Sequence, residues 1–239
     1  MPDALFSDPR LAILYDVFDA DRSDLDLYVG IVAELDAASV LDLGCGTGTL
    51  ALRLADQGRQ VVAVDPARAS LDIARTKPGA DRVEWRLGDA GSLAGVEVDA
   101  ATMTGNTAQA ILGRAWPDTL AGVRAALRPG GHLVFESRVP ARRAWEGWTP
   151  AHTRQRHSVP EIGSVEVWAE LLDVSEPLVT FRHVYVFPDG ARLVSESTLE
   201  FRTLDQLRQA AEAASFQVVE VRDAPDRPGL EHVLVCRAR

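Results

Sequence analysis

The feature that most constrains this chain of 239 residues is a glycine-rich stretch at residues 40–49, which reads VLDLGCGTGT. Its apolar start is long enough for one buried strand, and its three glycines let the backbone turn tightly and approach a ligand closely. Residues 50–55 then have helical spacing, so the glycines connect a strand to a helix N-terminus, which presents free N–H groups and a positive dipole end. The stretch predicts a nucleotide-type site at a β–α turn; a tight turn that binds nothing is the alternative.

Short apolar runs alternate with helical spacing along most of the chain. Two amphipathic helices, at 9–19 and after a capping Asp24, are expected before the first strand. This alternation predicts a Rossmann-like, doubly wound, mostly parallel seven-stranded α/β sheet. Its strands are expected at 39–43, 60–64, 83–87, 98–103, 132–136, 216–222 and 231–236.

The pattern changes after Arg138, where three stretches alternate with a period of two. They cover 164–172, 178–187 and 191–201, and the second places Val179, Phe181, His183, Tyr185 and Phe187 on one face. A Pro-Asp-Gly turn joins the last two stretches, which predicts an inserted antiparallel β meander. We expect a core at 1–137 and 201–239, with N-terminal helices at 1–37, and a lid or substrate subdomain at 138–200. An insertion after a strand's carboxyl end lies on the ligand side of such a sheet.

Charge and cysteine content narrow the class of function. The net charge of −10, from 35 acids and 25 bases, disfavours broad binding to nucleic acid or to an anionic membrane. Two distant cysteines, Cys45 and Cys236, give neither a disulfide framework nor zinc spacing. No signal-type segment and no run of 18 apolar residues is found, so a cytoplasmic protein is expected.

The glycine loop admits two cofactor classes. Gly46, Gly48 and Ala51 fit the dinucleotide pattern G-x-G-x-x-A, with Asp65 near the distance of a ribose-binding acid. With Asp42 and Gly44 included, the loop instead resembles the first motif of class I S-adenosylmethionine-dependent methyltransferases of the small-molecule type with an inserted β lid. Three later motifs agree with this resemblance over residues 10–136: Asp65 after the second strand, Gly88-Asp89-Ala90, and Leu127-Arg128-Pro129-Gly130-Gly131.

The resemblance implies S-adenosyl-L-methionine as the cofactor and a set of binding residues. Asp65 would accept both ribose hydroxyls, which suits a carboxylate with two acceptor oxygens. Asp89 would bind the adenine amine, Ala90 a ring nitrogen through its N–H, and Tyr15 would close over the methionine part. Asp42 either contacts ligand or holds the loop amides, and Tyr15 is otherwise a core aromatic. The cofactor-binding set implied is Tyr15, Asp42, Gly44, Cys45, Gly46, Gly48, Asp65, Pro66, Asp89, Ala90, Met103, Thr104 and Asn106.

Methyl transfer needs an aligned, desolvated nucleophile, and a hydroxyl or ammonium nucleophile also needs a base. Glu136, Arg138 and His183 are the catalytic candidates, and His157 is a further one, although no motif supports any of them. No paired acids follow the fourth strand, so no metal site is expected. The aromatic Pro-Pro motif of nucleic-acid amine methylation is replaced by Thr104-Gly105-Asn106.

Four functions remain open. The leading one is S-adenosylmethionine-dependent methyl transfer to N or O of a small-molecule acceptor. The second is an RNA or protein methyltransferase that grips a polymer through the arginines and tryptophans of 138–157. The third is an NAD-dependent oxidoreductase, and the fourth is a binding subunit without catalysis. Exposed edge strands in the insertion suggest a homodimer.

Overall fold

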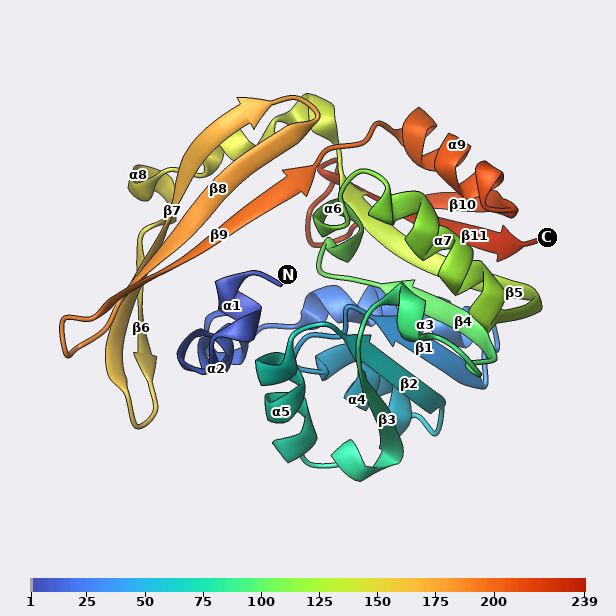
Figure 1. Ribbon diagram of the computed structural model, residues 1–239, viewed down its shortest axis with the longest axis horizontal. Helices are drawn as coiled ribbons and strands as arrows, with labels where there is room; N and C mark the ends of the chain where they lie inside the picture. Colours follow the sequence, from blue (N-terminus) through green and yellow to red (C-terminus); the bar gives the residue numbers. More distant parts are fainter. Residues whose placement is uncertain (1) are drawn as a thin grey trace.

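The computed structural model describes residues 2–239 and contains two β-sheets, with the N-terminal helices between them (Figure 1). The larger sheet has seven strands in the order β10-β11-β5-β4-β1-β2-β3. Strands β1 to β5 are parallel, whereas β11 runs antiparallel to both β5 and β10. The mostly parallel seven-stranded sheet is therefore confirmed. Its strands are β1 (Ser39–Leu43), β2 (Gln60–Asp65), β3 (Val83–Leu87), β4 (Val98–Met103), β5 (Leu127–Arg138), β10 (Phe216–Asp223) and β11 (Glu231–Ala238).

Helices cover both faces of this sheet, which is why β1 is buried along its whole length. Side chains alternate across a strand, so Leu41 packs with α7 and α9 in one cluster while Val40 packs with α3 and α4 in the other. The helices are α3 (Asp26–Glu34), α4 (Thr49–Asp56), α5 (Arg68–Thr76), α6 (Thr107–Ala110), α7 (Ala115–Ala126) and α9 (Leu204–Ala213). None within residues 2–239 has both the length and the apolar character needed to cross a membrane.

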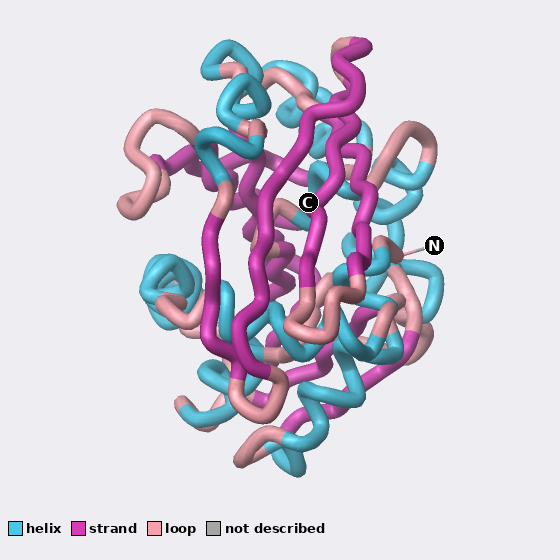
Figure 2. Tube along the Cα trace, turned by 90° about the vertical axis from the view of Figure 1, so that its left-hand side faces the viewer, coloured by secondary structure: helices cyan, strands magenta, loops and turns pink. Residues whose placement is uncertain are grey.

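The second sheet, here called the lid sheet, is antiparallel in the order β6-β7-β8-β9. Figure 2 looks onto its outer side, with the long strands running in front of the core. The lid sheet confirms the predicted inserted antiparallel meander, but it has four strands where three were predicted. The missed strand, β6, is polar except for Val159, so its sequence carries no apolar alternation. The lid sheet consists of β6 (Gln155–Val159), β7 (Gly163–Ser175), β8 (Leu178–Val186) and β9 (Arg192–Glu200), preceded by α8 (Pro150–Thr153).

Two local predictions were wrong. Asp24 does not cap a helix: α3 begins at Asp26 after a 3-10 turn, and the Asp24 carboxylate accepts hydrogen bonds from Arg22 instead. Strand β5 begins at Leu127 rather than His132, because Leu127 already pairs with Val98. Residues 128–131, which the sequence suggested as a turn before this strand, form an irregularity inside it.

The N-terminal bridge, residues 3–19, connects the two sheets and contains α1 (Ala4–Ser7) and α2 (Pro9–Phe18). On the core side, Asp16 accepts a hydrogen bond from the Thr47 hydroxyl at 2.6 Å and forms an ion pair with Lys77 at 2.6 Å. On the lid side, the Leu5 N–H donates to the Ser195 hydroxyl at 2.8 Å. The bridge therefore lies over the glycine loop and also contacts β9.

Candidate active site

The glycine loop has a backbone conformation that favours glycine, and at Gly44 and Gly48 a packing that only glycine allows. Gly44, Gly46 and Gly48 have φ angles of +76°, +54° and +81°. A Cβ on Gly44 would lie 2.6 Å from the Thr107 side chain, and one on Gly48 would overlap the Trp85 ring. The Gly44 N–H donates to the Val64 carbonyl at 2.8 Å, which fixes the loop on β2. The loop is thus set by its backbone, with a left-handed residue at the start of α4.

Asp65, at the end of β2, is held rigidly by backbone amides. Its Oδ2 accepts the Gly46 N–H at 2.8 Å and its Oδ1 accepts the Ala67 N–H at 2.7 Å. Burial raises the pKa of this carboxyl, and the two N–H groups oppose that shift. Each carboxylate oxygen has more than one acceptor site, so both can still accept a hydroxyl. This geometry fits the ribose diol.

Asp42 is fully buried on β1 and keeps one oxygen free. Its Oδ1 accepts the Thr102 hydroxyl at 3.0 Å, while its Oδ2 has no hydrogen-bond partner in residues 2–239. Burial raises the pKa of this carboxyl to about 7, and the nearby charge of Asp65 adds to the effect. The Gly44 amide donates to Val64 and the Gly46 amide to Asp65, so Asp42 supports neither. The Oδ2 atom is itself buried, and the Ala51 N–H at the start of α4 lowers the pKa of the carboxyl, so both roles of Asp42, ligand contact and support of backbone amides, stay predictions.

The remaining predicted cofactor residues lie at the same sheet edge but differ in exposure. Asp89 is exposed, and its Oδ1 accepts the Gly91 N–H at 2.8 Å at the start of a short 3-10 turn that includes Ala90. Pro66 is also exposed, and the Cys45 thiol is half-buried. Met103 is completely buried in the core, so its side chain packs against protein and only its backbone lies at the strand end.

A cavity of about 560 Å³ lies between the carboxyl edge of the larger sheet and the inner face of the lid sheet. All three catalytic candidates line it, Glu136 and Arg138 from β5 and His183 from β8. Tyr15 and Asn106 line it as well, whereas Asp42, Asp65 and Asp89 do not. The aromatic side chains that line it are Tyr15, Phe18, Tyr28, Trp148, Trp168, Phe181 and Tyr185.

Glu136 is the most perturbed acid of the cavity. Its Oε1 accepts the Asn106 N–H at 2.7 Å, and Asn106 in turn donates through Nδ2 to Glu231 at 3.1 Å. Burial and the Glu231 charge raise the pKa of Glu136 to about 8, although the Asn106 amide and the Arg138 and Arg227 charges oppose the shift. A carboxyl with a pKa near the working pH can both take up and release a proton.

The other two catalytic candidates have different environments. Arg138 donates to Gln109 Oε1 at 3.2 Å, lies 3.7 Å from Glu231 and 5.8 Å from the Trp148 ring centre, so it is a fixed cation. His183 has no hydrogen-bond partner in the described part of the chain, and burial lowers the pKa of its imidazole. A neutral imidazole facing a cavity can accept a hydrogen bond or a proton. His157 stacks on Phe18, with ring centres 4.2 Å apart.

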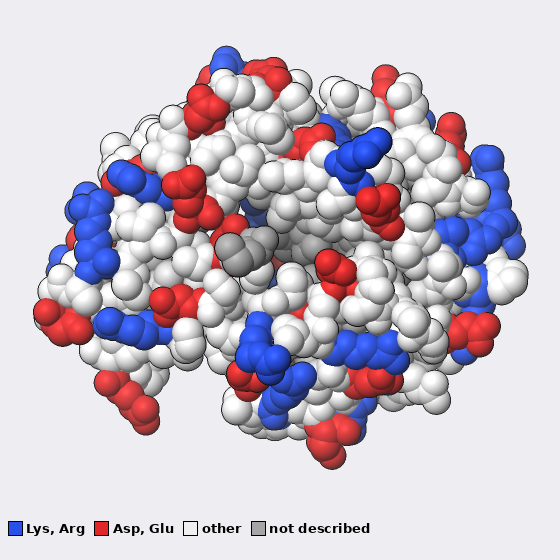
Figure 3. Space-filling model, viewed as in Figure 1, with Lys and Arg blue, Asp and Glu red and all other residues white. Residues whose placement is uncertain are grey.

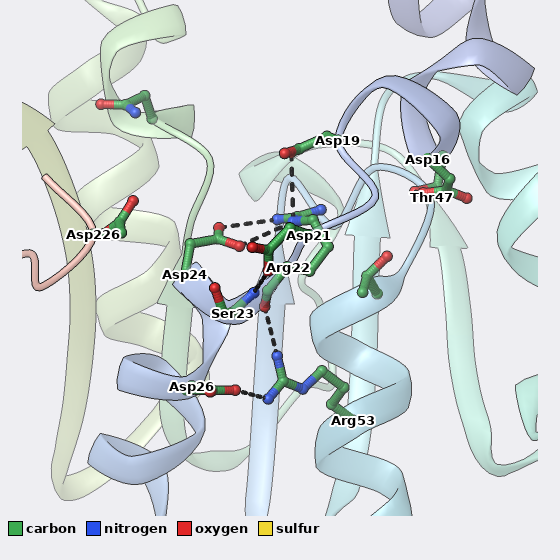
Figure 4. Close-up of polar contacts among 12 residues, drawn as sticks. Asp16, Asp19, Asp21, Arg22, Ser23, Asp24, Asp26, Thr47, Arg53 and Asp226 are labelled. Carbon is green, nitrogen blue, oxygen red and sulfur yellow. Dashed lines mark hydrogen bonds and ion pairs between the residues drawn. The ribbon is translucent and has the colours of Figure 1, made fainter. Parts of the chain in front are cut away.

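Sequence reasoning missed an arginine at the cavity wall. Arg22 donates to Asp24 at 3.1 Å, lies 3.4 Å from Asp19, and is 6.0 Å from the Tyr15 ring centre, as the close-up in Figure 4 shows for its acidic partners. Its backbone carbonyl accepts a hydrogen bond from Arg53 on α4 at 2.8 Å. The available signal was one arginine among several aspartates directly after the helix that carries Tyr15.

The larger sheet, its glycine loop and the acids at its strand ends match the arrangement of class I S-adenosylmethionine-dependent methyltransferases. Residues 40–131 match a family profile described as a methyltransferase domain. The cypemycin N-terminal methyltransferase of a Streptomyces species is 36% identical over 136 residues, which cover 53% of this chain and 55% of the relative. The chain thus aligns with about half of that relative's length.

Solved structures agree over nearly the whole chain. The CcbJ methyltransferase from Streptomyces caelestis has a TM-score of 0.73 at 25% identity and covers 94% of this chain and 96% of its own. CalS10, an amino pentose methyltransferase from Micromonospora echinaspora solved with bound S-adenosylmethionine, has a TM-score of 0.68 at 21% identity, with 92% and 93% covered. This second likeness shows the fold alone. Both include the lid sheet in the matched length.

Proposed function

We propose that this protein transfers the methyl group of S-adenosylmethionine to a nitrogen or oxygen of a small molecule bound between the two sheets. The cavity carries this proposal, because it brings the strand-end residues Asn106 and Glu136 opposite His183 of the lid sheet. Its volume of about 560 Å³ lies within the range of roughly 300–1,000 Å³ for small-molecule sites. The name of one relative, the cypemycin N-terminal methyltransferase, supports a small acceptor group.

The residues of the sheet edge suit the donor. Asp65 would take the ribose diol and Asp89 the adenine amine. When bound, S-adenosylmethionine supplies an electrophilic methyl on a sulfonium. The protein's part is to align the acceptor with that methyl and to exclude water. The N-terminal bridge over the glycine loop serves the second purpose.

The structure offers little for a polymer-binding reading of residues 138–157. Trp145 is 2% exposed and packs against Phe201 in the lid core, and Trp148 lines the cavity. Arg154 and Arg156 both pair with Glu166, at 3.5 and 3.6 Å. Figure 3 shows basic and acidic side chains interspersed on the face it presents. Trp145 is thus closed to stacking, and Trp148 faces the cavity rather than an outer surface along which successive bases could stack.

Calorimetry with S-adenosylhomocysteine and with NAD tests the proposed function. We expect the demethylated donor to bind and NAD to give no response. Incubation with S-adenosylmethionine and a mixed panel of small amines and alcohols should then release S-adenosylhomocysteine. Binding of NAD without any response to S-adenosylhomocysteine would favour the oxidoreductase instead and would overturn the proposal.

A further inference from the structure

The charged groups of the cavity are unevenly matched. Among residues 2–239, the cavity is lined by five acids and three arginines. Arg22 pairs with Asp19 and Asp24, and Arg227 pairs with Asp226 and Glu231. The acids are Asp19, Asp24, Glu136, Asp226 and Glu231, and the arginines are Arg22, Arg138 and Arg227. When Glu136 is ionised, the lining therefore carries an excess of negative charge, which favours a cationic ligand.

Glu136 is the acid without an arginine partner. Its Oε1 accepts one backbone N–H, and its Oε2 has no hydrogen bond or ion pair with any residue between 2 and 239. The nearest candidate cation, Arg138, directs its contacts to Gln109 and to Glu231. Because Glu136 is 4% exposed and lines the cavity, its free oxygen is available to a bound molecule rather than to bulk water.

Aromatic rings complete the environment opposite Glu136. Trp148 and Phe181 lie with ring centres 4.4 Å apart, and His183 continues the wall 5.4 Å beyond Phe181. Ring faces attract cations, and the chain already uses this where Arg138 lies 5.8 Å from the Trp148 ring centre. A carboxylate with a free oxygen and several aromatic side chains in one cavity together suit an ammonium group on an apolar body.

We propose that the acceptor is a small-molecule amine, which Glu136 binds as an ammonium ion and deprotonates. This inference rests on the proposed function and names its substrate class. The ammonium gives one proton to the Glu136 carboxylate, and the freed nitrogen lone pair forms the N–C bond to the methyl. The C–S bond breaks as its electron pair stays on sulfur, so the sulfonium becomes a neutral thioether and the product is a methylated ammonium. Glu136 then returns its proton to solvent.

The environment of Glu136 predicts a proton signature for amine binding. Burial and the Glu231 charge raise the pKa of Glu136 to about 8, while the Asn106 amide, Arg138 and Arg227 act in the opposite direction. At neutral pH the free protein therefore carries a proton there. An incoming ammonium favours the carboxylate form, so binding should release a proton to buffer. A neutral alcohol of the same shape should release none.

The test uses the full chain saturated with S-adenosylhomocysteine and two matched probes, benzylamine and benzyl alcohol. Calorimetry at pH 7.5 in two buffers of different ionisation enthalpy measures affinity and proton release together. We expect benzylamine to bind at least about tenfold more tightly than benzyl alcohol, and to release a proton. Equal affinities for the two probes, or no measurable binding of benzylamine at concentrations up to about 10 mM, would overturn the inference.

Two variants make the test specific to one carboxyl. Glu136→Gln should lower benzylamine affinity about tenfold or more, abolish proton release and leave benzyl alcohol binding within about twofold. Glu220→Gln removes the same charge from β10, where Glu220 pairs with Arg222 on the surface, and should change none of these values. An amine preference that persists in Glu136→Gln would also refute the inference. If the inference fails but the unmodified protein binds S-adenosylhomocysteine, the proposed function stands. If the unmodified protein does not bind S-adenosylhomocysteine, both the proposed function and the inference fail.

Discussion

Two regions of the site are built by different means: the glycine loop with its neighbouring strand ends, here called the donor wall, and the lid sheet, here called the lid wall. The donor wall depends on backbone: left-handed glycines, amides that donate to Val64 and Asp65, and the ends of parallel strands. The lid wall depends on side chains that alternate along β8, where Phe181, His183 and Tyr185 all face the cavity. Side chains can be exchanged on a strand without changing its path, but left-handed backbone cannot accept most residues. One fold can therefore keep its donor and vary its acceptor.

A pair of glycines, one in each wall, gives the largest expected contrast. Gly48 and Gly190 have nearly equal φ angles, +81° and +82°, but only at Gly48 would a Cβ overlap another side chain. Gly190→Ala should cost about 1–2 kcal/mol of unfolding free energy, from the left-handed backbone alone. Gly48→Ala adds overpacking against Trp85 and should cost about 2–5 kcal/mol. Urea unfolding measures both, and equal losses would show that packing at the glycine loop is unimportant.

A pair of aspartates that both accept backbone N–H groups separates ligand contact from loop support. Asp65→Ala should weaken S-adenosylhomocysteine binding by about 1.5–3 kcal/mol, because it removes the acceptors of the ribose diol. Asp189 supports the β8–β9 turn by accepting the Ala191 N–H at 2.9 Å. Asp189→Ala should leave that affinity unchanged. Calorimetry decides, and an unaltered affinity in folded Asp65→Ala would remove Asp65 from the ribose site.

The two walls should respond to pH in opposite directions. Burial raises the pKa of Asp42 to about 7 and of Glu136 to about 8, so the native state holds protons that the unfolded chain loses above pH 4–5. The stability that these groups contribute is full at low pH and declines as pH rises towards 8, by at most about 1.4 kcal/mol per pH unit for each group. Burial lowers the pKa of His183, so its contribution is lost as pH falls below 6.5.

Denaturation of the variants at pH values from 5 to 8.5 checks these signs. Asp42→Asn should flatten the decline of stability between pH 5 and about 7, and Glu136→Gln the decline between pH 5 and about 8. His183→Gln should flatten only the change below pH 6.5. A Glu136→Gln profile parallel to that of the unmodified protein would mean that Glu136 is charged in the native state throughout.

The smallest expected effect concerns the lid wall alone. Trp148 lines the cavity and contacts Phe181, so Trp148→Ala should weaken benzylamine and benzyl alcohol by a similar factor. We expect about 0.5–1.5 kcal/mol for the loss of one aromatic partner. S-adenosylhomocysteine affinity should not change, and Trp148→Phe should recover most of the loss. Calorimetric titration of both probes measures this, and a change in donor affinity would show that the walls are coupled.

The donor wall was predictable because its elements are local in sequence. The glycines at 44, 46 and 48 indicate the turn, and Asp65 comes directly after the apolar run that predicts the second strand. The structure gives each of them the backbone setting that a donor site requires, and it shows in addition the free oxygen of Asp42. The roles of these residues towards the donor stay predictions that the variants above would test.

The cavity between the two sheets was predictable only in part, because its residues come together through tertiary structure. Period-two alternation was enough to place His183 on a common face of β8, but it could not show that Glu136 would lie across the same cavity. β6 was missed because four of its five residues lack an apolar pattern. Arg22 and Arg227 come from turns 205 positions apart, and no local signal connects them.

The N-terminal bridge has a kinetic consequence. Because Asp16 holds Thr47 of the glycine loop and Lys77, while Leu5 holds Ser195 of the lid sheet, one short segment touches both walls. Binding of the donor at the glycine loop should therefore position the bridge and complete the surface to which the acceptor binds. We expect ordered addition, with the donor first and its thioether product last to leave. Product inhibition patterns would then show competition between the two forms of the donor, and none between that product and the acceptor.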